Sequence, residues 1–321
     1  IAEAAEPGST FKLASLLVAL EDQLVDLQDT VEVGNGVYVY SRKNGTMRDA
    51  HAPRRSRMSV QEIFEHSSNV GVSRIIFSNY AKRPQEFVNR LRSFGLGEKL
   101  GLQIDGEGAP FIRNANEKGW SGISLPWMSI GYECLITPLQ TLTFYNAVAN
   151  NGRMVKPLLV KEIRHRGQLV KSFETEVMRD SIASAEALQK AHIMLEGVVQ
   201  NGTGDVLKDS PYRIAGKTGT AQIAHSRFGY NKGNAQYQAS FVGYFPADKP
   251  AYSCIVIVNA PSNSLYYGGA VAAPIFKEIA DKVYSSRLDL HNGDVPVDSN
   301  VYTPVPYVRA GAQKETRQVL A

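Results

Sequence analysis

Apolar residues recur at the spacing of a helix face in the first eighty residues. They predict a helix over 9–21, directly after a Pro-Gly pair. A second helix is predicted from Val60 to the polar run 67–69, and a third over 70–76. The amino-terminal part of the chain is therefore expected to be helical.

The middle of the chain, from about 84 to 200, keeps a mostly helical period. Breaks that contain glycine interrupt it at 95–97, 106–108 and 150–152. These features predict an all-helical lobe over about 22–205.

The pattern changes after this lobe. Three short runs rich in β-branched and aromatic residues are separated by polar turns, which is typical of an antiparallel meander. The runs are 212–222, 237–246 and 251–259. A final helix is predicted from Gly268-Gly269, so the sheet portion is expected over about 206–288, together with the helix at 9–21.

The last residues, 289–321, carry three prolines among polar residues and keep no sustained period, which is typical of a linker or tail. One domain is therefore expected over 1–288. A chain of 321 residues with 43% hydrophobic and 21% charged residues agrees with a full core.

The charge balance and the cysteine content exclude some functions. Lys plus Arg less Asp plus Glu gives 35 − 31 = +4, and the densest basic cluster is only the run 54–57, so a nucleic-acid partner is not expected. Cys134 and Cys254 are too few for a disulfide framework or a structural zinc site. Neither a metal nor another cofactor is expected.

Candidate chemistry lies in three motifs, of which the first is Ser9-Thr-Phe-Lys12. Ser9 and Lys12 fall one turn apart on one face of the first helix, so Ser9 is a candidate nucleophile and Lys12 its base. Lys12 must be neutral to act so, which burial and a nearby cation favour. We expect Lys217 to be that cation. A helix cap and a solvated lysine are the simpler interpretation of this motif taken alone.

The second motif is Ser67-Ser-Asn69 at a predicted transition from helix to loop. Short polar side chains at such places often satisfy local backbone groups. In the catalytic interpretation, Ser67 relays a proton to the leaving amine, and Asn69 hydrogen-bonds Lys12 and the substrate.

The third motif is Lys217-Thr-Gly-Thr220 on a predicted strand. Alternation places Thr218 and Thr220 on one face and Lys217 on the other. Gly219 is expected to leave room for a ligand backbone, and an exposed strand of this kind can pair with an extended peptide. The N–H groups of Ser9 and Thr220 are the expected oxyanion hole.

Each motif occurs by chance in long chains, but this order is typical of serine acyltransferases that bind penicillin. Further stretches agree with it: Glu6-Pro-Gly-Ser9, Ser67-Ser-Asn-Val-Gly-Val72, Phe94-Gly-Leu-Gly97, Thr137-Pro-Leu-Gln140, Gly202-Thr-Gly204 and Tyr266-Tyr-Gly-Gly-Ala-Val271. Over about residues 5–287 the chain resembles the class B penicillin-binding proteins, in particular the division-specific D,D-transpeptidases of the penicillin-binding protein 3 type.

The resemblance implies an α/β (α+β) fold of the serine β-lactamase/D,D-peptidase type, with an antiparallel five-stranded sheet flanked by helices and a helical lobe. It implies crosslinking of peptidoglycan stem peptides that end in D-Ala-D-Ala, through an acyl-enzyme on Ser9 that β-lactam antibiotics also form. It further implies a membrane glycosyltransferase and division proteins as partners, and a place on the extracytoplasmic face of the membrane, anchored by a segment absent from this chain.

Two departures from the family pattern bear on the structure. Members often carry Gly-Tyr-Gly before the Thr-Pro-Leu-Gln stretch, whereas this chain has Glu133 at the third position. The first strands of the family's sheet precede the nucleophile, so an incomplete sheet with one exposed strand edge is expected here.

Two other functions share these motifs. A serine β-lactamase needs a glutamate that activates the deacylating water, commonly in a Glu-x-x-Leu-Asn context, and no such segment lies between Asn69 and Lys217. A non-catalytic β-lactam receptor or division scaffold would retain the pocket only for binding, and the intact Lys12 argues against it.

Overall fold

The computed structural model describes residues 1–42, 45–223, 236–262, 265–287 and 290. By its internal contacts the chain divides into two units, Ile1–Lys282 and Val283–Ala321. Nearly all of the expected tail, 289–321, lies outside the described residues, so the boundary at 288 stays a prediction.

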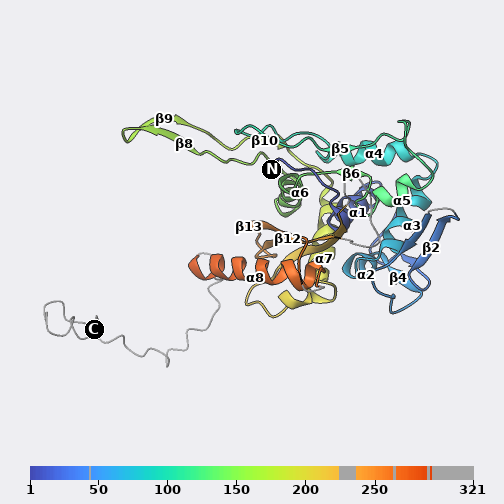
Figure 1. The fold of residues 1–321 in the computed structure, drawn as a ribbon. Coiled ribbons are helices and arrows are strands. Elements are labelled where there is room, and N and C mark those ends of the chain that lie inside the picture. Colours follow the sequence, from blue (N-terminus) through green and yellow to red (C-terminus); the bar gives the residue numbers. More distant parts are fainter. Residues whose placement is uncertain (43–44, 224–235, 263–264, 288–289, 291–321) are drawn as a thin grey trace, which may run out of the picture. The chain divides into compact units, whose positions relative to one another are not determined.

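The secondary structure alternates between helices and short strands along the described chain (Figure 1). The helices are η1 (Gly8–Phe11), α1 (Lys12–Glu21), α2 (Val60–Glu65), α3 (Asn69–Tyr80), α4 (Pro84–Ser93), α5 (Ser124–Met128), α6 (Pro138–Ala149), α7 (Ala185–Gln200), η2 (Asp205–Leu207) and α8 (Gly268–Ser286). The strands are β1 (Thr30–Glu32), β2 (Val37–Ser41), β3 (Gly45–Arg48), β4 (Arg57–Ser59), β5 (Phe111–Ile112), β6 (Cys134–Leu135), β7 (Met154–Val155), β8 (Glu162–His165), β9 (Gln168–Ser172), β10 (Val177–Arg179), β11 (Ala215–Gln222), β12 (Tyr237–Phe245) and β13 (Tyr252–Asn259). None of the described helices is long and apolar enough to cross a bilayer.

The main sheet pairs β11, β12 and β13 in that order, antiparallel throughout. The three predicted runs are therefore confirmed as strands. The described part of the chain holds three strands of this sheet and not five, because the residues before η1 form only an isolated bridge, from Ala5 to Ile136. The outer edge of β13 is not paired with any described strand, which agrees with the expected exposed edge.

Different helices cover the two faces of this sheet. On one face, Phe241 and Phe245 of β12 contact Phe276 of α8, with ring centroids 4.7 and 5.8 Å apart. On the opposite face, the Tyr244 hydroxyl lies 2.5 Å from Nδ1 of His192 on α7. Because successive residues of a strand point to opposite faces, β12 is buried on both sides, as its continuous apolar run requires.

Helix α1 lies at the centre of the core, where α3, α4 and α7 pack around it. Nine of its ten residues are buried, and they include Lys12. A helix buried around its whole circumference must be enclosed by other elements. The predicted helix over 9–21 is confirmed, with η1 as its first turn.

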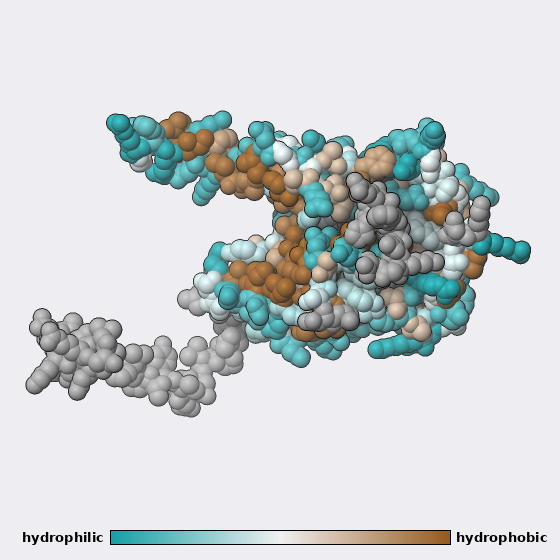
Figure 2. Space-filling view, viewed as in Figure 1, coloured by the Kyte–Doolittle hydropathy of each residue, from teal (hydrophilic) through white to brown (hydrophobic). Residues whose placement is uncertain are grey.

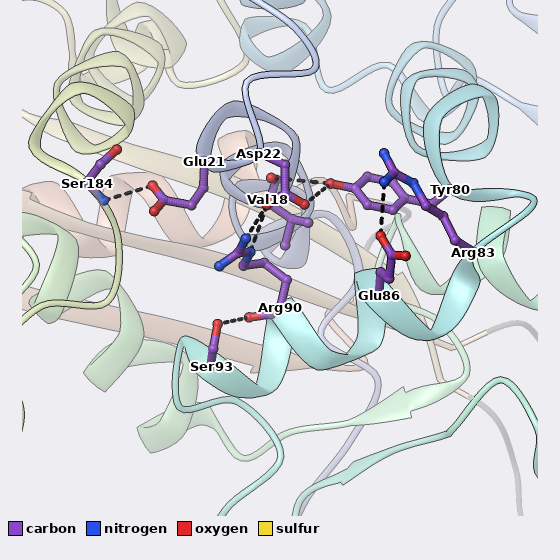
Figure 3. A network of polar contacts seen from close by, with 9 residues as sticks. All are labelled: Val18, Glu21, Asp22, Tyr80, Arg83, Glu86, Arg90, Ser93 and Ser184. Atoms are coloured by element: carbon purple, nitrogen blue, oxygen red, sulfur yellow. Dashed lines mark hydrogen bonds and ion pairs between the residues drawn. The ribbon is translucent and has the colours of Figure 1, made fainter.

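A polar network holds the carboxyl end of α1 (Figure 3). Oδ2 of Asp22 accepts a hydrogen bond from the Tyr80 hydroxyl at 2.5 Å, and Oδ1 accepts one from Nε of Arg90 at 2.9 Å. The carboxylate of Glu21 accepts the N–H of Ser184 at 2.8 Å. These bonds connect α1 to α3, α4 and the start of α7, which limits movement of the helix that follows Ser9.

The prediction that 22–205 is all helical is wrong. Within its described residues this region also holds five two-stranded sheets, formed by β1–β4, β2–β3, β5–β6, β7–β10 and β8–β9. Their strands have only two to five residues each. Such short strands contain too few alternations of apolar and polar residues to be distinguished from helical spacing.

The Thr137-Pro-Leu-Gln140 stretch is a helix start. The Thr137 hydroxyl accepts the N–H of Gln140, and the Gln140 side chain accepts the N–H of Thr137. This reciprocal cap satisfies two N–H groups that have no partner inside the helix, and a proline suits the first helical position. The motif therefore fixes the beginning of α6, which packs on β12 and β13.

The turn from Gly131 to Glu133 supports the residues before Ser9. The N–H of Gly8 donates to the Gly131 carbonyl at 3.1 Å, and the N–H of Glu133 donates to Oε1 of Glu6 at 2.9 Å. Glu133 has a φ of +56°, in the left-handed region that favours glycine. The departure from Gly-Tyr-Gly therefore retains a backbone conformation suited to glycine.

We predict that Glu133→Gly raises the free energy of unfolding by about 0.5–1 kcal/mol. A non-glycine residue in the left-handed region costs about 1–3 kcal/mol, part of which the greater freedom of glycine in the unfolded chain offsets. Chemical denaturation would measure the change. Glu133→Ala is the control, because alanine keeps the strained backbone and should give no gain; a less stable Glu133→Gly would contradict the prediction.

Candidate active site

Ser9 lies in η1 against strand β11. A Cβ built on the glycine before Ser9 would lie 2.8 Å from Cβ of Ala221, and one built on Gly219 would lie 2.9 Å from Cγ2 of Thr10. Gly8 and Thr10, on either side of Ser9, thus contact positions 221 and 219 of β11. Ser9 is therefore placed beside Thr220, and the first and third motifs are neighbours in space.

Lys12 is fully buried one turn after Ser9. Its Nζ donates hydrogen bonds to the Ser67 carbonyl at 2.6 Å, to Oδ1 of Asn69 at 2.7 Å and to Oγ of Ser67 at 3.1 Å. The structure thus joins the first and second motifs through this amine. The Ser9 hydroxyl itself has no hydrogen bond to a described residue.

Burial lowers the pKa of Lys12 to about 7, and the nearby Asp49 carboxylate opposes this by raising it. Burial also lowers the pKa of Lys217 well below its ordinary value, and repulsion from Lys12 lowers it further. The expectation that burial and the Lys217 cation together lower the pKa of Lys12 is confirmed for burial, whereas the charge that acts on Lys12 is the Asp49 carboxylate and not Lys217.

The backbone at Ser67 is in an unusual conformation, with a φ of +57° between α2 and α3. This turn directs both the carbonyl and the hydroxyl of Ser67 toward Lys12. Ser68 has a different task, because its hydroxyl accepts the N–H of Gly71 and caps α3. The middle residue of the motif is structural, whereas its two neighbours contact the buried amine.

Asp49 and the end of β3 brace this loop, which the sequence analysis did not anticipate. The Asp49 carboxylate accepts hydrogen bonds from the Ser68 hydroxyl at 2.9 Å and from the N–H of Val70 at 2.9 Å. The Arg48 carbonyl accepts one from Nδ2 of Asn69 at 2.7 Å. Asp49 follows a two-stranded hairpin with no motif around it, so only the tertiary contact identifies it.

The side chains of the third motif have partners inside the protein. Nζ of Lys217 donates to the Thr218 carbonyl at 3.1 Å and lies 5.7 Å from the ring centroid of Phe64, one turn before Ser67. The Thr218 hydroxyl lies 2.6 Å from the hydroxyl of Thr203, in the Gly-Thr-Gly stretch after α7. Nζ of Lys217 also donates to the Thr218 hydroxyl at 3.3 Å, so Lys217, Thr218 and Thr203 form one polar cluster at β11.

Thr220 and Gly219 are fixed by the start of α8. Oγ1 of Thr220 accepts the N–H of Gly268 at 3.1 Å. A Cβ on Gly268 would lie 2.4 Å from the Gly219 carbonyl, so the two backbones are in direct contact. A Cβ on Gly219 would lie 2.2 Å from Oγ of Ser240. The space beside Gly219 is thus filled by the protein, and the expectation that it accommodates a ligand backbone is corrected.

The geometry gathers Ser9, Lys12, Ser67, Asn69 and β11 around one position. Strand β11 lies at an edge of the main sheet, since it pairs with β12 alone among the described strands. An edge strand beside a serine can hold an extended peptide in line with the hydroxyl. The arrangement suits acyl transfer from such a peptide.

Comparison with known proteins agrees with this geometry. Residues 1–281 match the family described as the penicillin binding protein transpeptidase domain. Peptidoglycan D,D-transpeptidase FtsI of Buchnera aphidicola is 30% identical over 282 residues, covering 87% of this chain and 45% of that protein. Penicillin-binding protein PbpB of Mycolicibacterium smegmatis is 31% identical over 311 residues, covering 94% of this chain and 45% of that protein. The chain thus spans less than half the length of either relative.

Solved structures give the same result. Penicillin-binding protein 3 of Mycobacterium tuberculosis in complex with ampicillin has a TM-score of 0.76 and 27% identity, over 92% of this chain and 65% of that one. The transpeptidase domain of penicillin-binding protein 3 from Burkholderia pseudomallei has a TM-score of 0.73 and 27% identity, over 88% of this chain and 80% of that one. The ordered motifs, the match over residues 1–281 and this likeness of fold show that the chain belongs to the penicillin-binding protein transpeptidase domain family.

Proposed function

We propose that this chain is the catalytic domain of a peptidoglycan D,D-transpeptidase that acts through an acyl-enzyme on Ser9. The observation that carries the proposal is the buried amine of Lys12, held by Ser67 and Asn69 one turn from Ser9. A solvated lysine would be protonated at neutral pH, whereas an amine with a pKa of about 7 is partly neutral and can act as a base.

The hydrogen bonds of Lys12 suit this role. A neutral amine has two N–H donors and one lone pair. The two short contacts, to the Ser67 carbonyl and to Oδ1 of Asn69, use the two donors. The longer contact, to Oγ of Ser67, can reverse because a hydroxyl both donates and accepts. The lone pair then faces the Ser67 hydroxyl, which can exchange a proton with it.

Acylation follows from these positions. The Ser9 hydroxyl gives its proton to Lys12 as its oxygen bonds the carbonyl carbon of the penultimate D-Ala. The bond from that carbon to the terminal D-Ala nitrogen then breaks, and the proton passes from Lys12 through Ser67 to the leaving amine. The amine of a neighbouring stem peptide attacks the ester, loses a proton to the same relay and releases Ser9.

The third motif supplies the binding groups in this proposal. The donor peptide pairs with the free edge of β11, and Lys217 with the hydroxyls of Thr218 and Thr220 recognises its terminal carboxylate. The N–H groups of Ser9 and Thr220 bind the developing oxyanion, where one donor is typically worth about 2.7–4 kcal/mol. The side-by-side position of Ser9 and Thr220 supports this pairing of donors.

We also propose that β-lactams acylate Ser9, since one relative, penicillin-binding protein 3 of Mycobacterium tuberculosis, has been solved in complex with ampicillin and with aztreonam. The full-length protein would act on the extracytoplasmic face of the bacterial membrane during septal synthesis. Its partners would be a membrane glycosyltransferase and other division proteins. The relatives named FtsI support the division role.

A labelled penicillin should form an adduct on Ser9 that survives for many minutes. Gel fluorescence would follow the label, and peptide mapping would locate it. Ser9→Ala should remove the label, whereas Ser93→Ala, at the exposed end of α4, should retain it. Label on another residue would refute the nucleophile, and release within seconds would favour a β-lactamase.

The rate constant of acylation should rise with pH through a midpoint near 7, because only neutral Lys12 accepts the proton and its pKa is about 7. Stopped-flow measurements of acylation between about pH 5 and 9 would give the profile. Arginine has the positive charge of a protonated lysine but does not give up its proton near neutral pH. Lys12→Arg should therefore lower the rate constant of acylation by about 10²–10⁴-fold. A flat profile would contradict the assignment of the base.

The same pKa shift has a consequence for stability. Lys12 has a lower pKa folded than unfolded, so between about 7 and its ordinary value of 10.5 the unfolded chain binds the extra proton. The contribution of this group to stability therefore increases with pH over that interval.

Asp49→Asn should move the midpoint of the acylation profile to lower pH, because the carboxylate that raises the pKa of Lys12 is removed. It should also cost about 1 kcal/mol of stability through weaker hydrogen bonds at the start of α3. Ser68→Ala is the matched control: it removes the cap next to Asp49 but no charge, so stability should fall while the midpoint stays. A shift of the midpoint in Ser68→Ala would refute the electrostatic explanation.

A further inference from the structure

The hairpin of β8 and β9 lies apart from the catalytic groups. All four residues of β8 and all five of β9 are exposed. In Figure 1 the two strands extend beyond β10, and Figure 2 shows apolar surface along this arm. Among its large apolar side chains, Ile163 is 47%, Leu169 56% and Val170 64% exposed.

An exposed hairpin of this composition lacks the packing that usually stabilises one. Two strands alone are marginally stable in water, and a third strand or a packed face is normally needed. The base is held: the side-chain carbonyl of Gln103 accepts the N–H groups of Leu159 and Val160, and Lys156 pairs with Glu176 at 3.0 Å. Beyond this base the apolar side chains face solvent, which indicates an interaction surface.

The apolar side chains lie on both faces of the hairpin. Ile163 is paired with Lys171, and Arg164 with Leu169, so Ile163 and Leu169 point to opposite faces. The tip is the polar pair Arg166-Gly167. A bilayer surface would favour apolar residues on one face or at the tip. This distribution instead suits a partner that lies alongside the strands.

The charge of the hairpin selects the partner's chemistry. From Lys161 to Ser172 there are four lysines and arginines and one acidic residue, Glu162. Glu162 already pairs with Arg164 at 2.8 Å. The other three basic residues form no ion pair with a described residue, so their positive charge is available to a partner. An acidic segment would be attracted, and a basic one repelled.

The two edges of the hairpin differ. The register shift between the pairs of Ile163 and Arg164 leaves Val170 of β9 as a bulge, a feature that discourages strand addition. The N–H of Phe173 donates to the Lys161 carbonyl, so the next pair, Glu162 and Ser172, directs its backbone groups outward. The regular edge of β8 is therefore the better template.

We propose that the edge of β8 binds an extended, acidic segment of a partner protein as an added strand. Main-chain pairing would give affinity, and Ile163 with the basic side chains would give selectivity. The inference is independent of the reaction at Ser9.

Two substitutions test the edge directly. Glu162→Pro removes an outward N–H from β8 without breaking a bond of the hairpin, and Ser172→Pro does the same to β9. The probes are a blocked alternating Glu-Val decapeptide and its Lys-Val counterpart, added to the isotope-labelled chain. We expect the Glu-Val peptide to shift the amide resonances of β8. The dissociation constant of this peptide should rise at least about tenfold in Glu162→Pro, because the edge of β8 is lost, and should change by no more than about twofold in Ser172→Pro.

Charge and alternative occupants complete the test. Glu162→Gln should bind the Glu-Val peptide at least as well as the wild type, since it keeps the N–H and removes the negative charge. Penicillin labelling of Ser9 should be unchanged in every variant. Equal binding of the Lys-Val peptide, loss of binding in Ser172→Pro alone, hairpin shifts only with phosphatidylglycerol vesicles, or self-association through the hairpin would each overturn the proposal.

Discussion

The structure depends on the enclosure of one amine. Lys12 lies in the core on a helix buried around its circumference, and among the described residues its Nζ donates to Ser67 and to Asn69, at the turn where α3 begins. Burying an unpaired ammonium would be strongly unfavourable, so the loop that carries Ser67 and Asn69 must close on it. The same enclosure lowers the pKa of Lys12 to about 7. One contact thus joins distant parts of the chain and leaves the amine partly neutral near pH 7, as the proposed base must be.

The surrounding elements maintain that contact. Asp49 holds the start of α3 through Ser68 and Val70, and its charge moderates the effect of burial on Lys12. On the sheet side, backbones approach so closely that side chains are excluded, as at Gly219 and Gly268. These glycines allow η1, β11 and the start of α8 to meet beside Ser9. The site is rigid where the three segments cross, which suits a mechanism based on positioning.

The hairpin of β8 and β9 differs physically from this core. The residues of both strands are exposed, and the contacts that described residues make with the hairpin lie at its base. Segments with few buried contacts are where a domain can change its partners without disturbing its chemistry. The domain therefore separates the buried candidate active site from an exposed surface of basic and apolar residues.

The sequence alone determined the order of the motifs, the helix at 9–21 and the three strands of the main sheet, because long periodic runs record which face is buried. It also placed Ser9 and Lys12 on one helix face. The short strands within 22–205 were missed, since two to five residues show no period. Only the tertiary structure decided that Asp49 braces the loop, that Ser68 is a cap, that Gly219 accommodates Ser240, and that burial lowers the pKa of Lys12. Each of these depends on residues far apart in the chain, whose distances no local pattern encodes.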